Sequence, residues 1–147
     1  MTTNNDIRIG TLIHGTLQDE DLLEAFANEL ERISDGSYSD EIAEARTMVK
    51  YGITGENGHG DTASEVIINL IDILNGYAPP HVYFGAHAGD GSDFGYWPIG
   101  DDWDNCSGHW VSKNVFIDHD CLTCVEINDH GNITVSELRG RVIWSTV

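Results

Sequence analysis

The sequence predicts an α+β fold in which three N-terminal helices pack on one face of a C-terminal antiparallel sheet of about five or six strands. Two patterns lead to this prediction. Apolar residues recur at helical spacing up to residue 76, whereas the rest of the chain contains short β-branched and aromatic runs separated by turn residues. A length of 147 residues suits one domain, residues 1–147, and we expect its first six residues to be disordered.

The first helix is expected after a short strand near residues 7–13, with Thr16 as its N-cap and Asp35-Gly36 as its end. The second is predicted from about residue 37 or 39 to Lys50. The third, over residues 62–76, is apolar around most of its circumference, which is typical of a helix buried in a core. The buried stripe of the first helix consists of Leu22, Phe26, Leu30 and Ile33.

The strands are predicted in the second half of the chain. Residues 81–105 carry aromatic runs on both sides of a glycine-rich stretch, which indicates two strands joined by a loop. Residues 128–132, Asn-Asp-His-Gly-Asn, are suited to a hairpin connection. The further predicted strands are residues 115–117, 122–127, 133–138 and 142–144.

The charge of the chain is its strongest functional indication. Twenty-five acidic residues face seven basic ones, giving a net charge of −18, and each third of the chain is negative. Solubility of a small domain needs a charge of magnitude about 2–8, so the excess calls for another explanation. Such a chain repels nucleic acid and anionic membranes and attracts basic protein surfaces. With no apolar run long enough for a membrane span, we expect a cytoplasmic protein.

Cysteine and histidine residues at metal-ligand spacing form the first candidate site. Cys106 and His109, followed by Cys121 and Cys124 and with His119 nearby, are ligands suited to tetrahedral zinc. However, residues three apart on a regular strand point to opposite faces, and intracellular cysteine is commonly a small buried hydrophobe. We therefore assign no metal and no cofactor, and it stays open whether these four ligands converge.

Acidic residues around the glycine-rich loop form the second candidate site. His87, Asp90 and Asp93 could support acid–base chemistry or a metal, and three aspartates at residues 101, 102 and 104 could bind calcium. The simpler interpretation is that these groups cap turns or are solvated. No catalytic motif is present, so we assign no catalytic residue and expect a protein that is not an enzyme.

The acidic surface is the third candidate. Glu20, Glu24 and Glu31 fall opposite the apolar stripe of the first helix, where they would form a solvent-facing ridge. Carboxylates one helical turn apart are about 5–6 Å apart, a spacing of the same order as that of DNA phosphates. The predicted partner-binding residues are Glu20, Glu24, Glu31, Asp90, Asp93, Asp101, Asp102 and Asp104, with Trp103 as an aromatic anchor.

Residues 85–98 (GAHAGDGSDFGYWP) and 125–135 (VEINDHGNITV) resemble segments of small acidic proteins encoded by bacteriophages and actinobacteria. The resemblance is confined to the second half of the chain and transfers no catalytic residue. It implies a phage or mobile-element origin, and small acidic phage proteins include DNA mimics that block restriction enzymes or CRISPR effectors.

The leading hypothesis is therefore an anti-restriction or anti-CRISPR inhibitor that mimics DNA and occupies a basic nucleic-acid-binding site of a host defence protein. Its location would be the host-cell cytoplasm, with no direct contact to nucleic acid or membrane. The first alternative is a small metal-dependent enzyme or a zinc-stabilised module. The second is an acidic interaction domain without mimicry.

Overall fold

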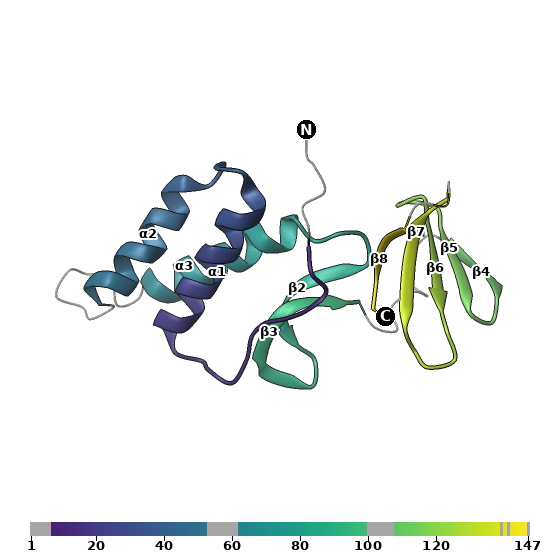
Figure 1. Cartoon of the computed structure of the whole chain (residues 1–147), viewed down its shortest axis with the longest axis horizontal. Helices are drawn as coiled ribbons and strands as arrows, with labels where there is room; N and C mark the ends of the chain where they lie inside the picture. The colour runs from purple at the N-terminus through teal and green to yellow at the C-terminus, as the bar shows by residue number, and fades with distance from the viewer. Residues whose placement is uncertain (1–6, 53–61, 100–107, 139, 141, 147) are drawn as a thin grey trace. The chain divides into compact units, whose positions relative to one another are not determined.

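The computed structural model describes residues 7–52, 62–99, 108–138, 140 and 142–146, and within these the chain is an α+β protein of three helices and two sheets (Figure 1). Residues 1–6, for which disorder is predicted, lie outside the described residues. The chain divides into two compact units. The helical unit comprises Met1–Ala78 and Phe84–Trp97, and the strand unit comprises Pro79–Tyr83 and Pro98–Val147.

The helical unit contains three helices and a three-stranded sheet of order β1-β3-β2. Strand β1 pairs antiparallel with β3, with Gly10 opposite Tyr96 and Thr11 opposite Gly95. A Cβ atom at Gly95 would collide with the carbonyl oxygen of Gly10, so the close approach of the two strands requires glycine there. The elements are β1 (Gly10–Ile13), α1 (Asp19–Ser34), α2 (Ser39–Tyr51), α3 (Thr62–Gly76), β2 (Val82–His87) and β3 (Asp90–Pro98).

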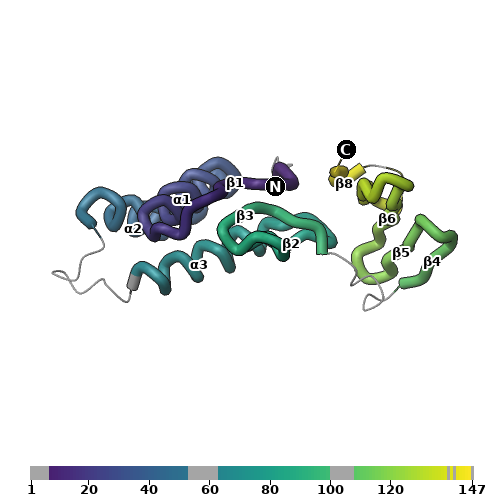
Figure 2. Tube along the Cα trace, turned by 90° about the horizontal axis from the view of Figure 1, so that it is seen from below, coloured from purple at the N-terminus to yellow at the C-terminus, as the bar shows by residue number. Residues whose placement is uncertain are grey.

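Helix α1 packs against α2 and α3 (Figure 2) and also contacts β1. The ring of Phe26 on α1 packs edge-on against Phe84 and Phe94, with centroid distances of 5.3 and 5.4 Å. The hydroxyl of the buried Tyr96 donates a hydrogen bond of 3.2 Å to the Leu74 carbonyl near the end of α3. This burial raises the pKa of Tyr96.

The strand unit is a five-stranded antiparallel meander of order β4-β5-β6-β7-β8. One row of side chains crosses four of the strands, because Phe116 pairs with Val125, Val125 with Val135 and Val135 with Trp144. All four side chains are buried and form the core of this sheet. The strands are β4 (Gly108–Ser112), β5 (Val115–Asp118), β6 (Thr123–Ile127), β7 (Ile133–Glu137) and β8 (Val142–Ser145).

The structure differs from the sequence-based expectation in several details of the fold. Strand β4, Gly108–Ser112, was not predicted. The strands form two sheets, whereas one was expected, because β2 and β3 pair with β1. Helix α1 begins at Asp19 with Gln18 as its N-cap, so Thr16 is not the cap; its hydroxyl instead donates to Asp21 Oδ2 at 2.6 Å. Strand β6 begins one residue later than predicted, because Leu122 has a φ of 53° and cannot continue a strand.

Among the described helices, none has the length and apolar character that crossing a membrane requires.

Candidate functional site

The predicted acidic ridge lies on α1, where Glu20, Glu24 and Glu31 are all exposed. Their exposure follows from the helical period, since the opposite face of α1 is filled by the apolar core residues. No ion pair among the described residues involves Glu20 or Glu24. These two carboxylates therefore present their charge to solvent.

Glu31, at the other end of the ridge, is neutralised by a residue of α2. Arg46 donates to both carboxylate oxygens of Glu31, at 3.1 and 2.6 Å, and to Asn28 Oδ1 at 3.0 Å. These contacts lower the pKa of Glu31 and raise the pKa of Arg46. The unneutralised part of the ridge is thus its N-terminal half.

A hollow of about 410 Å³ borders this half of the ridge. Asp21 and Glu24 of α1 line it together with His14, which follows β1. His14 in turn contacts Asp90 of β3 through Nε2 and Oδ2, which are 2.9 Å apart. His14 therefore borders both the hollow that the α1 carboxylates line and the Asp90 carboxylate of β3.

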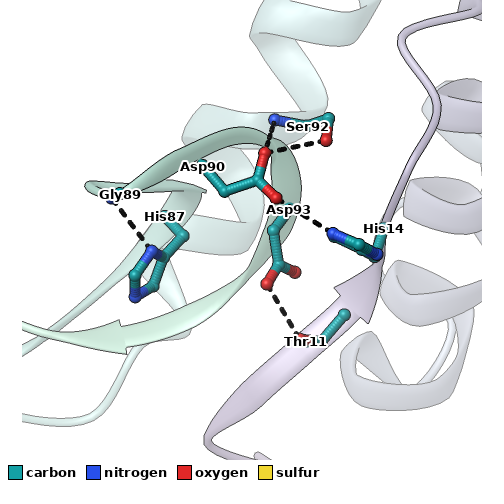
Figure 3. A network of polar contacts seen from close by, with 7 residues as sticks. All are labelled: Thr11, His14, His87, Gly89, Asp90, Ser92 and Asp93. Carbon is teal, nitrogen blue, oxygen red and sulfur yellow. Dashed lines mark hydrogen bonds and ion pairs between the residues drawn. The ribbon is translucent and has the colours of Figure 1, made fainter.

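Asp90 and its neighbours form a network of polar contacts at the start of β3 (Figure 3). Its Oδ1 accepts hydrogen bonds from the backbone N–H of Ser92 at 3.0 Å and from the Ser92 hydroxyl at 2.8 Å. These two bonds, followed by that of His14, lower the pKa of Asp90 to about 2. Asp90 is therefore ionised across the physiological pH range and cannot act as a general acid there.

Asp93 belongs to the same hairpin but contacts a different strand. Its Oδ2 accepts a hydrogen bond of 3.2 Å from the Thr11 hydroxyl of β1, whereas its buried Oδ1 has no hydrogen-bond partner among the described residues. His87 forms its contact within the hairpin turn, where its Nδ1 accepts a hydrogen bond from the N–H of Gly89 at 2.9 Å (Figure 3). The structure thus pairs Asp90 with His14, and no hydrogen bond among the described residues joins His87 to either aspartate.

The remaining sequence-predicted residues of this region, which are Asp101, Asp102, Trp103, Asp104 and Cys106, lie outside the described residues.

The described residues among the predicted zinc ligands lie in different parts of the strand unit. His109 Nδ1 and His119 Nε2 lie 2.8 Å apart, because pairing of β4 with β5 brings their ends together. Cys124 lies on β6 between the buried Thr123 and Val125, so its side chain points to the other face of the strand. Partial burial raises the pKa of the Cys124 thiol.

Cys121 joins a cluster that the sequence did not indicate. Ligand atoms of His81, Asp118 and Cys121 all lie within 4.8 Å of one another. His81 Nε2 is 3.3 Å from Asp118 Oδ2 and 2.8 Å from the hydroxyl of Thr123. Burial lowers the pKa of His81, and the charge of Asp118 opposes this shift.

The backbone around this cluster explains how it forms. His81 follows Pro79-Pro80 and has a φ of 67°, a conformation that histidine tolerates better than most residues. Asp118, the last residue of β5, accepts hydrogen bonds through Oδ1 from the N–H groups of Asp120 and Cys121, at 2.8 and 3.2 Å. The carboxylate thereby shapes the turn that carries Cys121. Nothing in the linear sequence connects His81 to this turn.

Comparison of the chain with protein-family models, with curated proteins and with solved structures gives no match.

Proposed function

We propose that the protein is a non-enzymatic inhibitor whose acidic surface occupies the basic nucleic-acid-binding site of a partner protein. The observation that carries the proposal is the unpaired charge. With seven Lys and Arg residues and 25 acidic ones, complete one-to-one pairing would still leave the net charge of −18. A surface of this charge attracts a Lys/Arg-rich groove and raises the rate of association.

The distribution of ion pairs among the described residues supports a surface role for this charge. The buried Glu29 is held by Arg32 through contacts of 2.9 and 2.6 Å. Glu20 and Glu24, both exposed, have no such partner among the described residues. They lie about 6 Å apart along the helix axis, as expected for residues separated by four positions. Arg32 thus serves a buried carboxylate and Arg46 the exposed Glu31, while Glu20 and Glu24 remain accessible to a partner.

The N-terminal half of the α1 ridge and the Asp90 carboxylate are the parts of the described surface that we assign to the contact. His14 connects them, because it lines a hollow with Asp21 and Glu24 and also contacts Asp90. Asp90, with its pKa of about 2, carries a permanent negative charge at neutral pH. These carboxylates would form a row that resembles DNA phosphates. The row would be rigid, because a helix and a hydrogen-bonded hairpin hold the groups in place.

We further propose that the partner is a restriction or CRISPR protein of a bacterial host and that the inhibitor acts in the host-cell cytoplasm. This part rests on the resemblance of residues 85–98 and 125–135 to segments of small acidic phage proteins. An acidic interaction domain without mimicry is the alternative. It differs in one consequence: its partner would bind DNA and this protein at the same time.

A charge-reversal experiment tests the proposal. Glu20→Lys with Glu24→Lys changes the net charge by the same amount as Glu65→Lys with Asp72→Lys, two exposed positions on α3. Partners would be captured from bacterial lysate at about 50 and 200 mM salt, and each captured protein would be assayed for DNA binding in competition with the inhibitor.

We expect the α1 double variant to lose affinity for the partner by about ten- to a hundredfold, about 1.4–2.8 kcal/mol. The DNA-binding site of the partner should then be free to bind DNA. The α3 variant should retain most of its affinity. Equal effects of the two variants would show that total charge, and not the α1 surface, determines binding. A ternary complex with DNA would exclude mimicry.

A further inference from the structure

We propose that His81, Asp118 and Cys121 form a binding site for a divalent transition-metal ion of the zinc type in the strand unit. The site is independent of the acidic surface, because all three residues belong to the unit that does not contain α1. It also differs from the ligand set that the cysteine spacing suggests, since Cys124 points to the other face of β6.

The distance between the His81 ring and the Asp118 carboxylate is closer to that of two ligands on one metal ion than to that of a direct ion pair. A charge-assisted hydrogen bond between an imidazole and a carboxylate is about 2.7–2.9 Å long, whereas His81 Nε2 and Asp118 Oδ2 are 3.3 Å apart. Two ligands bound to tetrahedral zinc at about 2.0–2.2 Å are separated by about 3.4 Å. A sulfur ligand at about 2.3 Å is about 3.6 Å from either of them, and the third ligand atom, from Cys121, lies within 4.8 Å of both.

Burial gives an energetic reason for a cation at this position. Asp118 and His81 have exposed fractions of 2% and 8%. A buried carboxylate requires compensation by charge or by hydrogen bonds. Oδ1 receives two backbone N–H groups, and Oδ2 faces the histidine ring. A divalent ion between Oδ2 and the ring would compensate the buried charge of the carboxylate.

The surroundings hold these ligands in place. The N–H groups of Asp120 and Cys121 fix the Asp118 carboxylate, and such contacts to a metal-binding carboxylate tune its orientation. The Thr123 hydroxyl lies 2.8 Å from the His81 Nε2. Because Nε2 has one lone pair, it would have to exchange this contact for the ion, and a threonine hydroxyl, which can rotate its hydrogen away, does not prevent the exchange.

The cysteine side of the cluster opens to the surface. Cys121 is exposed and lines a hollow of about 510 Å³ with Leu122, Glu137 and Leu138. Three protein ligands leave the fourth position of a tetrahedral ion to water or to an external ligand. One sulfur, one nitrogen and one oxygen ligand favour zinc or cobalt over magnesium and calcium, which prefer oxygen alone.

Metal titration of the full-length chain tests the site, with Zn²⁺ and Co²⁺ as the probes. Zinc would be followed by calorimetry and by metal content after dialysis, and cobalt by its absorption, since a cysteine ligand adds a sulfur-to-metal charge-transfer band. We expect one ion per chain and a cysteine-dependent band. Zinc should also raise the temperature of unfolding, because an ion that binds the native state stabilises it.

Matched variants identify the ligands. Cys121→Ala should lower the affinity for zinc by at least a hundredfold and abolish the charge-transfer band, while Cys124→Ala should leave both unchanged. Asp118→Asn should lower the affinity at least tenfold. Since Cys121 is exposed, its variant keeps the test valid even where a substitution of the buried His81 prevents folding.

Two results would overturn the proposal. One is a folded wild-type chain that takes up no stoichiometric zinc or cobalt at micromolar concentration. The other is binding that persists in Cys121→Ala and disappears when His109 and His119, the neighbouring histidine pair, are both replaced by alanine. Neither result would affect the proposal for the acidic surface.

Discussion

Replacement of Arg46 by glutamine should strengthen binding to a basic partner, although it removes an ion pair. Arg46 neutralises Glu31 and thereby shortens the acidic ridge of α1. Its guanidinium also holds Asn28, at 3.0 Å. In Arg46→Gln, Glu31 would regain an unpaired charge in line with Glu20 and Glu24. The ridge would then extend over three turns of the helix.

The magnitudes follow from the geometry and the exposure. The side chains of Arg46 and Glu31 are 43% and 60% exposed, and ion pairs of this kind contribute about 0.2–1 kcal/mol to stability. One additional negative charge about 6 Å from a partner's cation, at an effective dielectric constant between about 40 and 80, contributes about 0.7–1.4 kcal/mol. We therefore expect a stability loss below about 1 kcal/mol and a gain in affinity of about three- to tenfold.

Urea unfolding would measure the stability change, and binding at several salt concentrations would measure the affinity. The control is Lys113→Gln, which makes the same change in net charge at an exposed position of the strand unit. It should change the affinity less than Arg46→Gln does. A folded Arg46→Gln protein with unchanged or weaker binding would refute a role of the α1 ridge.

Three further predictions concern the fold and its electrostatics. Phe116→Ala should cost about 3–5 kcal/mol in urea unfolding, since Phe116 is a buried member of the row across the five-stranded sheet, whereas the exposed Val111→Ala should cost less than about 0.5 kcal/mol. Gly95→Ala should destabilise the protein by more than about 1 kcal/mol, because its methyl group meets a backbone carbonyl of β1; a neutral result would show that the two strands can move apart. Ser92→Ala should raise the pKa of Asp90 above about 2 in an NMR titration. The ionised form of Asp90 stabilises the fold above the ordinary carboxyl pKa of 3.8, and this contribution disappears as the pH falls towards 2; an unchanged pKa would exclude the serine hydroxyl as a cause.

The helices could be predicted from the sequence because their signal is local. The stripe of Leu22, Phe26 and Leu30 repeats at the helical period, and these residues are buried in α1. The start of α1 was less predictable. Thr16 has the chemistry of an N-cap, but its hydroxyl contacts Asp21 while the helix begins at Asp19. Local chemistry therefore predicts the element more reliably than its boundary.

The division into two sheets and the His81 cluster could not be predicted in this way, because both depend on contacts between distant segments. Strand β1 pairs with β3 across more than eighty residues, which also brings His14 to Asp90. His81 has a positive φ and lies beside the β5–β6 turn. The spacing of cysteine and histidine residues in the sequence does not predict this contact. Motif spacing grouped Cys121 with Cys124, whereas the structure places it beside His81 and Asp118.

Added salt should increase the stability of the fold and decrease the affinity for a basic partner. The net charge of −18 makes the folded chain repel itself. The two buried acids, Glu29 and Asp118, have local partners, whereas Glu20 and Glu24 have none among the described residues. The distance over which exposed charges interact falls from about 10 Å at 0.1 M salt to about 3 Å at 1 M. Added salt should therefore weaken the repulsion and raise the temperature of unfolding. The same screening should weaken the complex with a basic partner. A fold that salt destabilises would mean that the exposed acids are engaged in internal pairs, and they would then be unable to serve as a substitute for DNA phosphates.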